Sequence, residues 1–123
     1  MSLRVLVVDD SSTIRKIIIR SLASVGVPDA VEAADGNEAL AIFQKADFDL
    51  VLTDWNMPGK DGLELFKDIK GLKPEVPVIM ITTEAEKRRV TEAIAAGVHD
   101  YLVKPFTPDA LREKIDSIVA AHA

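Results

Sequence analysis

The sequence predicts an α/β fold: a doubly wound, five-stranded parallel sheet with five helices. Short runs of β-branched and other apolar residues alternate with segments in which apolar residues recur every three or four positions. The first run, at residues 3–8, is almost entirely apolar, as expected of a strand that is covered on both faces. Strands that alternate with helices form parallel sheets, and right-handed crossovers then favour a doubly wound topology.

The first two strand–helix units are predicted within the first 45 residues. Residues 3–8 form the first strand, and residues 30–34 form a weaker second strand. Gly26 ends the first helix, while Asp35 and Glu38 supply a capping box at the start of the second. The apolar faces of these two helices are formed by Ile14, Ile17, Ile18, Leu22, Val25, Ala39, Leu40 and Phe43.

The other three units follow the same pattern, with strands at residues 50–53, 78–81 and 101–103. Gly97 ends the fourth helix. The helices begin at capping pairs, which are Asp61 with Glu64, Thr83 with Glu86, and Thr107 with Pro108. Their inward-facing residues are Leu65, Phe66, Ile69, Val90, Ile94, Leu111, Ile115, Ile118 and Val119.

The length and composition exclude several classes of protein. With 123 residues, the chain has the usual size of one domain, which we expect to span residues 1–123. It contains no cysteine, which excludes disulfides and thiolate chemistry and suits the cytoplasm. The net charge of −5 comes without a basic block, so nucleic-acid binding is not expected. Neither a signal peptide nor an apolar run of the roughly 18 residues that span a bilayer is present, so membrane association is not expected.

Polar side chains follow four of the five predicted strands. Asp9 and Asp10 follow the first strand, Asp54 the third, Thr82 the fourth and Lys104 the fifth. Because the carboxyl ends of parallel strands lie along one edge of the sheet, where ligands bind, these groups should form a single site.

Three carboxylates in one crevice repel each other. Each close pair costs up to about 4 kcal/mol at ~4 Å and an effective dielectric near 20. A hard divalent cation removes this cost, and Mg²⁺ prefers an oxygen shell of this kind. We therefore expect Asp9, Asp10 and Asp54 to bind Mg²⁺, directly or through water, with the main-chain oxygen of Asn56 as a further ligand.

The hydroxyl of Thr82 and the ammonium of Lys104 suit the oxygens of a phosphoryl group. Together with a metal ion they would stabilise a phosphoryl group in transfer. A carboxylate can accept that group as an aspartyl phosphate. Asp54 is the best candidate nucleophile, because the third strand should lie between the acidic pair and the Thr82–Lys104 pair.

Each residue also has a structural interpretation when it is taken alone. Asp10 could cap the first helix, Asp54 could serve the turn at Pro58, and Lys104 could be a solvated lysine. The convergence of all these groups on one edge favours function. Among the neighbouring residues, Trp55 is expected to pack near the site while partly exposed, and the basic run at residues 87–89 to be a solvated helix face.

Four motifs carry a resemblance to a known family: VVDDSSTIRK, TDWNMPGKDGLEL, MITTEAEK and DYLVKPFTPDAL. Over essentially its whole length the chain resembles bacterial response-regulator receiver domains, and in particular the single-domain chemotaxis regulators. This resemblance implies a flavodoxin-like strand order of 2-1-3-4-5. It also implies a phosphorelay function and a chain that catalyses only its own phosphorylation and dephosphorylation, and so is not an enzyme in the usual sense.

The resemblance assigns a role to each residue of the site. Asp54 would accept a phosphoryl group from a sensor histidine kinase or from small acyl phosphates. Asp9 and Asp10 would hold Mg²⁺, with the main-chain oxygen of Asn56. Lys104 and Thr82 would contact the phosphoryl group. The bond between Lys104 and Pro105 would be cis, and Tyr101 would act as the aromatic switch.

Phosphorylation would change a docking surface formed by the fourth helix, the fifth strand and the fifth helix. The residues implied for this surface are Ala85, Glu86, Lys87, Val90, Tyr101, Val103 and Lys114. The implied partners are a chemotaxis-type histidine kinase and a downstream protein, such as the flagellar motor switch or a phosphatase, with the chain itself monomeric. Glu86 and Thr83 depart from motor-binding relatives, which have lysine and alanine there, so an isolated receiver of a larger or non-chemotaxis regulator is the alternative.

Three other functions fit the sequence less well. A haloacid-dehalogenase-like phosphatase needs an acid two residues after its nucleophile, where this chain has Asn56. A flavodoxin-like nucleotide carrier needs a first loop that cradles phosphate, which Asp9 and Asp10 would repel. A purely structural pseudo-receiver would lack part of the site, and here each component is present.

Overall fold

The computed structural model describes residues 3–83 and 89–121. Strands and helices alternate along the chain in the order β1 (Arg4–Val8), α1 (Ser12–Ser24), β2 (Asp29–Ala33), α2 (Gly36–Lys45), β3 (Leu50–Asp54), α3 (Gly62–Leu72), β4 (Val78–Thr83), α4 (Val90–Ala96), β5 (Asp100–Lys104) and α5 (Pro108–Ala121). The strands form one sheet in the order β2-β1-β3-β4-β5, and every neighbouring pair is parallel. The predicted fold class and strand order are therefore confirmed.

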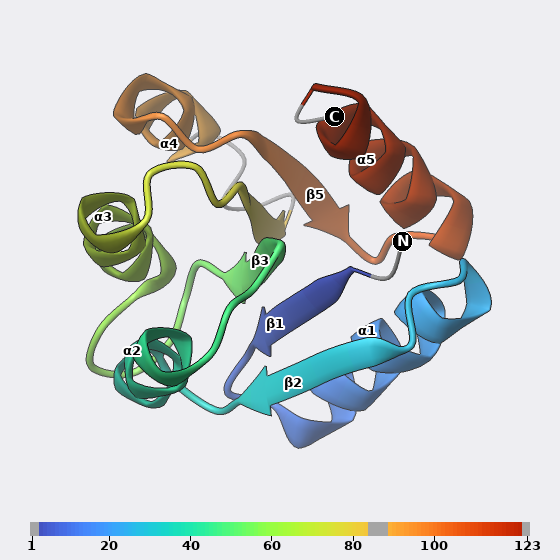
Figure 1. Cartoon of the computed structure of the whole chain (residues 1–123), viewed down its shortest axis with the longest axis horizontal. Coiled ribbons are helices and arrows are strands. Elements are labelled where there is room, and N and C mark those ends of the chain that lie inside the picture. The colour runs from blue at the N-terminus through green and yellow to red at the C-terminus, as the bar shows by residue number, and fades with distance from the viewer. Residues whose placement is uncertain (1–2, 84–88, 122–123) are drawn as a thin grey trace.

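Helices cover both faces of the sheet (Figure 1). Side chains alternate along each strand, so that Val5 and Val7 face one core while Leu6 and Val8 face the other. The first core lies under α1 and α5, and the second lies under α2, α3 and α4. β1, β3 and β4 lie inside the sheet and contribute residues to both cores, which explains why their sequences are nearly continuous apolar runs.

The helix that follows the first acidic pair is capped by a serine. The Ser11 hydroxyl accepts a hydrogen bond from the backbone N–H of Ile14 at 3.3 Å. This removes the alternative that Asp10 caps α1, and it leaves the Asp10 carboxylate for the site. At the next two helices Asp35 caps α2 as predicted, but the Glu38 carboxylate accepts the backbone N–H of Ala34 at 3.4 Å. Asp61 with Glu64 forms the predicted capping box on α3.

Three predicted core positions on the helices are wrong. Ile17, Ile94 and Val119 expose 48%, 47% and 38% of their surface. In α4 the buried residue is Ala93, one position before Ile94. A small residue lets this short helix lie close to the sheet, and Ile94 is then rotated away from the core by about 100°, the angle between successive helical residues.

The predicted start of this helix, at Thr83 with Glu86, falls mostly outside the described residues; Thr83 itself is the last residue of β4.

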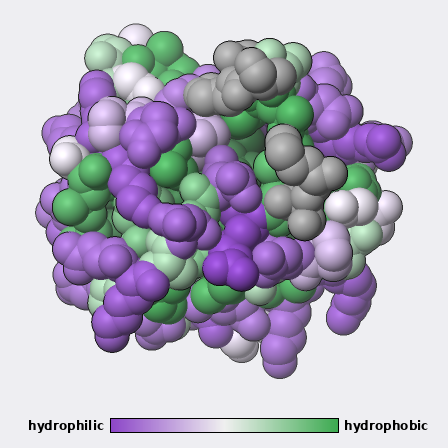
Figure 2. Space-filling model, viewed as in Figure 1, coloured by the Kyte–Doolittle hydropathy of each residue, from purple (hydrophilic) through white to green (hydrophobic). Residues whose placement is uncertain are grey.

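Apolar and polar residues are interspersed on the face that Figure 2 shows. Within the described part of the chain, no helix has both the length and the apolar character that a membrane crossing requires.

The start of α3 lies unusually close to the end of β3. Gly62, the first residue of α3, donates its backbone N–H to the Trp55 carbonyl at 2.9 Å. A Cβ atom at this position would lie 2.3 Å from the Asp54 carbonyl oxygen and 2.8 Å from the Met80 sulfur. Only glycine therefore allows α3 to pack against the residue that ends β3.

We predict that Gly62→Ala destabilises the protein and that Gly71→Ala, in the same helix, does not. Overpacking of this kind costs about 1–3 kcal/mol, and the backbone contact at Gly62 should place it at the upper end. A Cβ at Gly71 meets nothing within 4 Å, so this variant should be neutral or more stable by up to about 1 kcal/mol. Urea unfolding measures both free energies; equal effects would contradict the close packing.

Candidate functional site

The three acidic side chains predicted to converge do come together. Asp9 directly follows β1, and Asp54 is the last residue of β3, the neighbouring strand. One carboxylate oxygen each of Asp9, Asp10 and Asp54 lies within 4.8 Å of the others. Asp9 is 1% exposed and Asp54 6%, whereas Asp10 is exposed at the mouth of the site. Such a set of hard oxygen donors fits a divalent cation.

Asp9 is held in place by bonds to both its main chain and its side chain. Its carboxylate accepts the backbone N–H of Ser11 at 2.9 Å. Its carbonyl oxygen accepts a hydrogen bond from Arg15 at 2.6 Å, and Arg15 in turn pairs with Glu32 at 2.9 Å. These contacts hold Asp9 in place through groups of the chain itself.

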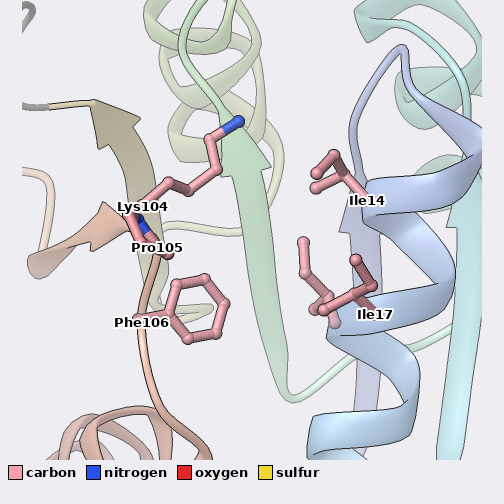
Figure 3. Close-up of a pocket in the computed structure, with 6 residues that line it drawn as sticks. Ile14, Ile17, Lys104, Pro105 and Phe106 are labelled. Carbon is pink, nitrogen blue, oxygen red and sulfur yellow. The ribbon is translucent and has the colours of Figure 1, made fainter.

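Lys104 bridges two of the carboxylates from the far side of the site. Its ammonium nitrogen lies 3.5 Å from an oxygen of Asp9 and 3.5 Å from an oxygen of Asp54. In Figure 3 the nitrogen reaches the tip of β3, while Pro105 and Phe106 turn away from it. The Lys104–Pro105 bond is cis, as the resemblance implies. One ammonium against three carboxylates leaves the site with an excess of negative charge, which again suits a divalent cation.

Thr82 lies between the strands that carry Asp54 and Lys104. In the register of the sheet Ile81 pairs with Asp54, and Thr82 pairs with Val103, the residue before Lys104. Thr82 is fully buried, and its hydroxyl donates to the Thr83 carbonyl at 3.4 Å, which is a long hydrogen bond. Thr82 is thus one residue beyond the level of Asp54 on the neighbouring strand, and its hydroxyl makes a long hydrogen bond that a better acceptor can replace.

The turn after Asp54 differs from the prediction at two residues. Trp55 is fully buried, not partly exposed, because its ring packs into the core beneath α3. Arg89 does not lie on a purely solvated face as predicted, because its guanidinium is 4.3 Å from the centre of that ring. Arg89 also donates a hydrogen bond to the side-chain oxygen of Asn56 at 3.3 Å. Arg89 and Asn56 are 33 residues apart in the sequence, so no local pattern could have predicted this contact.

The predicted docking surface is described in part. Figure 1 shows β5 between α4 and α5, and Tyr101 and Val103 of β5 are half-buried there. The ammonium of Lys114 lies 5.4 Å from the centre of the Tyr101 ring and 3.0 Å from the Asp100 carboxylate. Val90, at the start of α4, is also half-buried. Ala85, Glu86 and Lys87 lie outside the described residues.

An apolar pocket adjoins the site. It has a volume of about 250 Å³ and lies between α1 and the connection from β5 to α5 (Figure 3). Its lining consists of Ile14, Ile17, Ile18, Lys104, Pro105 and Phe106. The aliphatic part of Lys104 therefore forms a wall of this pocket while its ammonium contacts the carboxylates.

Comparison with known proteins identifies the class to which this fold and site belong. The family model described as the response regulator receiver domain matches residues 5–116. The chain is a member of the response-regulator receiver family, a class of phosphorelay signalling domains.

Among its relatives are single-domain chemotaxis regulators. The chain is 48% identical to the chemotaxis protein CheY-3 of Vibrio cholerae, over 95% of this chain and 92% of that protein. It is 45% identical to the chemotaxis protein CheY1 of Helicobacter pylori, over 98% and 99%. The crystal structure of the chemotaxis protein CheY4 of Vibrio cholerae has a TM-score of 0.87 at 38% identity, covering 96% of this chain and 99% of that one. NtrX of Brucella abortus has a TM-score of 0.92 at 32% identity, but this chain covers only 28% of it.

We predict that Asp10→Asn stabilises the metal-free protein, because it removes one of three mutually repelling charges. The gain in free energy of unfolding should be up to about 1 kcal/mol, since Asp10 is exposed and its charge is screened. The extra stability that Mg²⁺ gives to the unchanged chain should be smaller in this variant. Urea unfolding with and without Mg²⁺ measures both effects.

Glu75→Gln is the matched control, because Glu75 is exposed and lies outside the acidic cluster. It removes the same charge and should change neither quantity. If both variants behaved alike, the repulsion would be a property of the whole acidic chain and not of the site.

Proposed function

We propose that Asp54 accepts a phosphoryl group from a histidine kinase or a small acyl phosphate. The observation that carries this proposal is the double contact of Lys104 with Asp9 and Asp54, because it gathers a nucleophile, an acidic pair and a cation at one sheet edge. In the transfer, a carboxylate oxygen of Asp54 attacks phosphorus. The bond from phosphorus to the donor breaks, and its electron pair leaves with the donor.

The chain's own residues supply position and charge for this transfer. Lys104 neutralises the oxygens of the incoming group while it stays close to Asp54, and the Thr82 hydroxyl exchanges its long bond to Thr83 for a phosphoryl oxygen. Asp9, Asp10 and Asp54, with the main-chain oxygen of Asn56, would hold Mg²⁺. When bound, the ion would neutralise negative charge on the transferring group.

The readout would be a change in the docking surface of α4, β5 and α5. Movement of Thr82 toward the phosphoryl group frees space on the same face of the sheet as Tyr101, since Met80 pairs with Tyr101 and Thr82 with Val103. Tyr101 would then move inward. A shift of this equilibrium from 1:99 to 99:1 takes about 5.5 kcal/mol, which a few charge-assisted hydrogen bonds can largely supply.

The route that this switch serves is proposed to be chemotaxis in the cytoplasm. Relatives at 45–48% identity over nearly their whole length carry the name of chemotaxis proteins, which supports a chemotaxis-type kinase and a motor-switch or phosphatase partner. We propose a monomer that acts through binding and catalyses only its own phosphorylation and dephosphorylation. The alternative is the receiver of a larger regulator, which the short coverage of NtrX illustrates.

We predict that Asp54→Asn abolishes phosphorylation by acetyl phosphate with Mg²⁺, because the amide is not a nucleophile. Asp116→Asn, on the exposed face of α5, removes the same charge and should be labelled normally. Intact-protein mass spectrometry measures the labelling. Labelling of Asp54→Asn at the normal rate would refute the choice of nucleophile.

We predict that Thr82→Ala uncouples the docking surface from the site. In the unchanged chain, beryllofluoride with Mg²⁺ should shift the amide NMR signals of Tyr101, Val103 and Lys114. In Thr82→Ala the shifts should stay confined to the surroundings of Asp54, whereas Thr13→Ala, an exposed hydroxyl on α1, should behave like the unchanged chain. Full shifts at Tyr101 in Thr82→Ala would show that the signal takes another route.

A further inference from the structure

Arg89 places a fixed positive charge on the turn that follows Asp54. Its guanidinium lies 4.3 Å from the centre of the Trp55 ring and donates to the Asn56 side chain at 3.3 Å. These two partners are the first and second residues after Asp54. The contact joins a residue at the start of α4 to the two residues that directly follow Asp54.

The ring beneath Arg89 is a rigid support. Trp55 is fully buried, its backbone N–H donates to the Ile81 carbonyl at 3.2 Å, and its carbonyl accepts from Gly62 at 2.9 Å. Elsewhere in the described chain, Lys70, Lys73 and Lys114 lie over aromatic rings at 5.9, 5.7 and 5.4 Å. Arg89 is closer than any of these, as expected for a planar guanidinium stacked on an indole.

The site has an electrostatic difficulty that this charge reduces. A phosphoryl donor is an anion, and it must approach the carboxylates of Asp9, Asp10 and Asp54, whose charge is only partly balanced by the ammonium of Lys104 between Asp9 and Asp54. Fixed charges in a cleft raise or lower the local concentration of a charged substrate. Stacking uses the face of the guanidinium, while its N–H donors lie at the edge, where they can meet an anion.

We propose that Arg89 attracts anionic phosphoryl donors to Asp54, and that it favours dianionic acyl phosphates over donors of lower charge. This inference rests on the proposed function. In the reaction with acetyl phosphate, an oxygen of Asp54 forms a bond to phosphorus, and the bond from phosphorus to the acyl oxygen breaks. Acetate leaves with the electron pair, and Arg89 keeps its protons throughout.

The test compares two neutral variants, Arg89→Met and Arg89→Gln, with Arg89→Lys, which keeps the charge. Arg112→Met, on the exposed face of α5, is the matched control. Each full-length chain, checked for folding by circular dichroism, reacts with acetyl phosphate or phosphoramidate in the presence of Mg²⁺. At neutral pH the first donor is a dianion and the second a monoanion. The measured quantities are the second-order labelling rate constant at low and high ionic strength, and the rate of loss of the label after the donor is removed.

At low ionic strength the neutral variants should react with acetyl phosphate about three- to tenfold more slowly than the unchanged chain. The decrease should be smaller with phosphoramidate, and it should shrink at high ionic strength because salt screens the charge. Arg89→Lys should keep most of the rate, and Arg112→Met all of it. Loss of the label should be unchanged, since no donor takes part in that step.

Other outcomes would overturn the inference. An equal decrease for both donors at every ionic strength, or an altered loss of the label, would show that Arg89 only orders the turn. No decrease at all would show that its charge does not act on the donor. If the unchanged chain were labelled by neither donor, the proposed function itself would fail, and this inference with it.

Discussion

The crowding of Asp9, Asp10 and Asp54 at the carboxyl edge of the sheet is the constraint on which the rest of the site depends. Two of these carboxylates are almost completely shielded from water, so their charges cannot be dissipated by solvent. Lys104 reaches across from β5 to contact both of the buried ones, yet it cannot balance all three. The site therefore carries an excess of negative charge, which a bound cation would reduce. The Thr82 hydroxyl and the Arg89 guanidinium experience the electrostatic field of this charge.

The elements of the scaffold are closely joined around Asp54. α3 begins at Gly62, which packs against the Asp54 carbonyl. The backbone N–H of Trp55 donates a hydrogen bond to Ile81 of β4, and Arg89, at the start of α4, contacts the Trp55 ring. A movement of the chain at the end of β3 would therefore act directly on three elements, which are α3, β4 and α4. Close-packed interiors move between discrete arrangements more readily than they deform, which makes a two-state response physically reasonable.

Most of the architecture could be predicted from the sequence because it depends on local patterns. Apolar strand runs, periodic helix faces and the caps at Asp35 and Asp61 each act within a few residues, and the topology then brings Asp9, Asp54 and Lys104 together without further information. The errors arise where packing between elements decides. Trp55 is buried by neighbours that its own sequence context does not reveal. Ala93 takes the place expected of Ile94 because the helix lies close to the sheet. Arg89 contacts the Trp55 ring and Asn56, and Asn56 is 33 residues away in the sequence.

The groups of the site come from the ends of strands. Asp9 follows β1, Asp54 and Lys104 are the last residues of β3 and β5, and Thr82 is the last but one of β4, while the solvent-facing sides of the helices lie away from this edge. Substitutions on those outer faces can therefore change the surface of the chain while these four side chains stay in place. A single chemical apparatus of this design can be reused by many signalling routes, because selectivity and chemistry are encoded in separate parts of the same small chain.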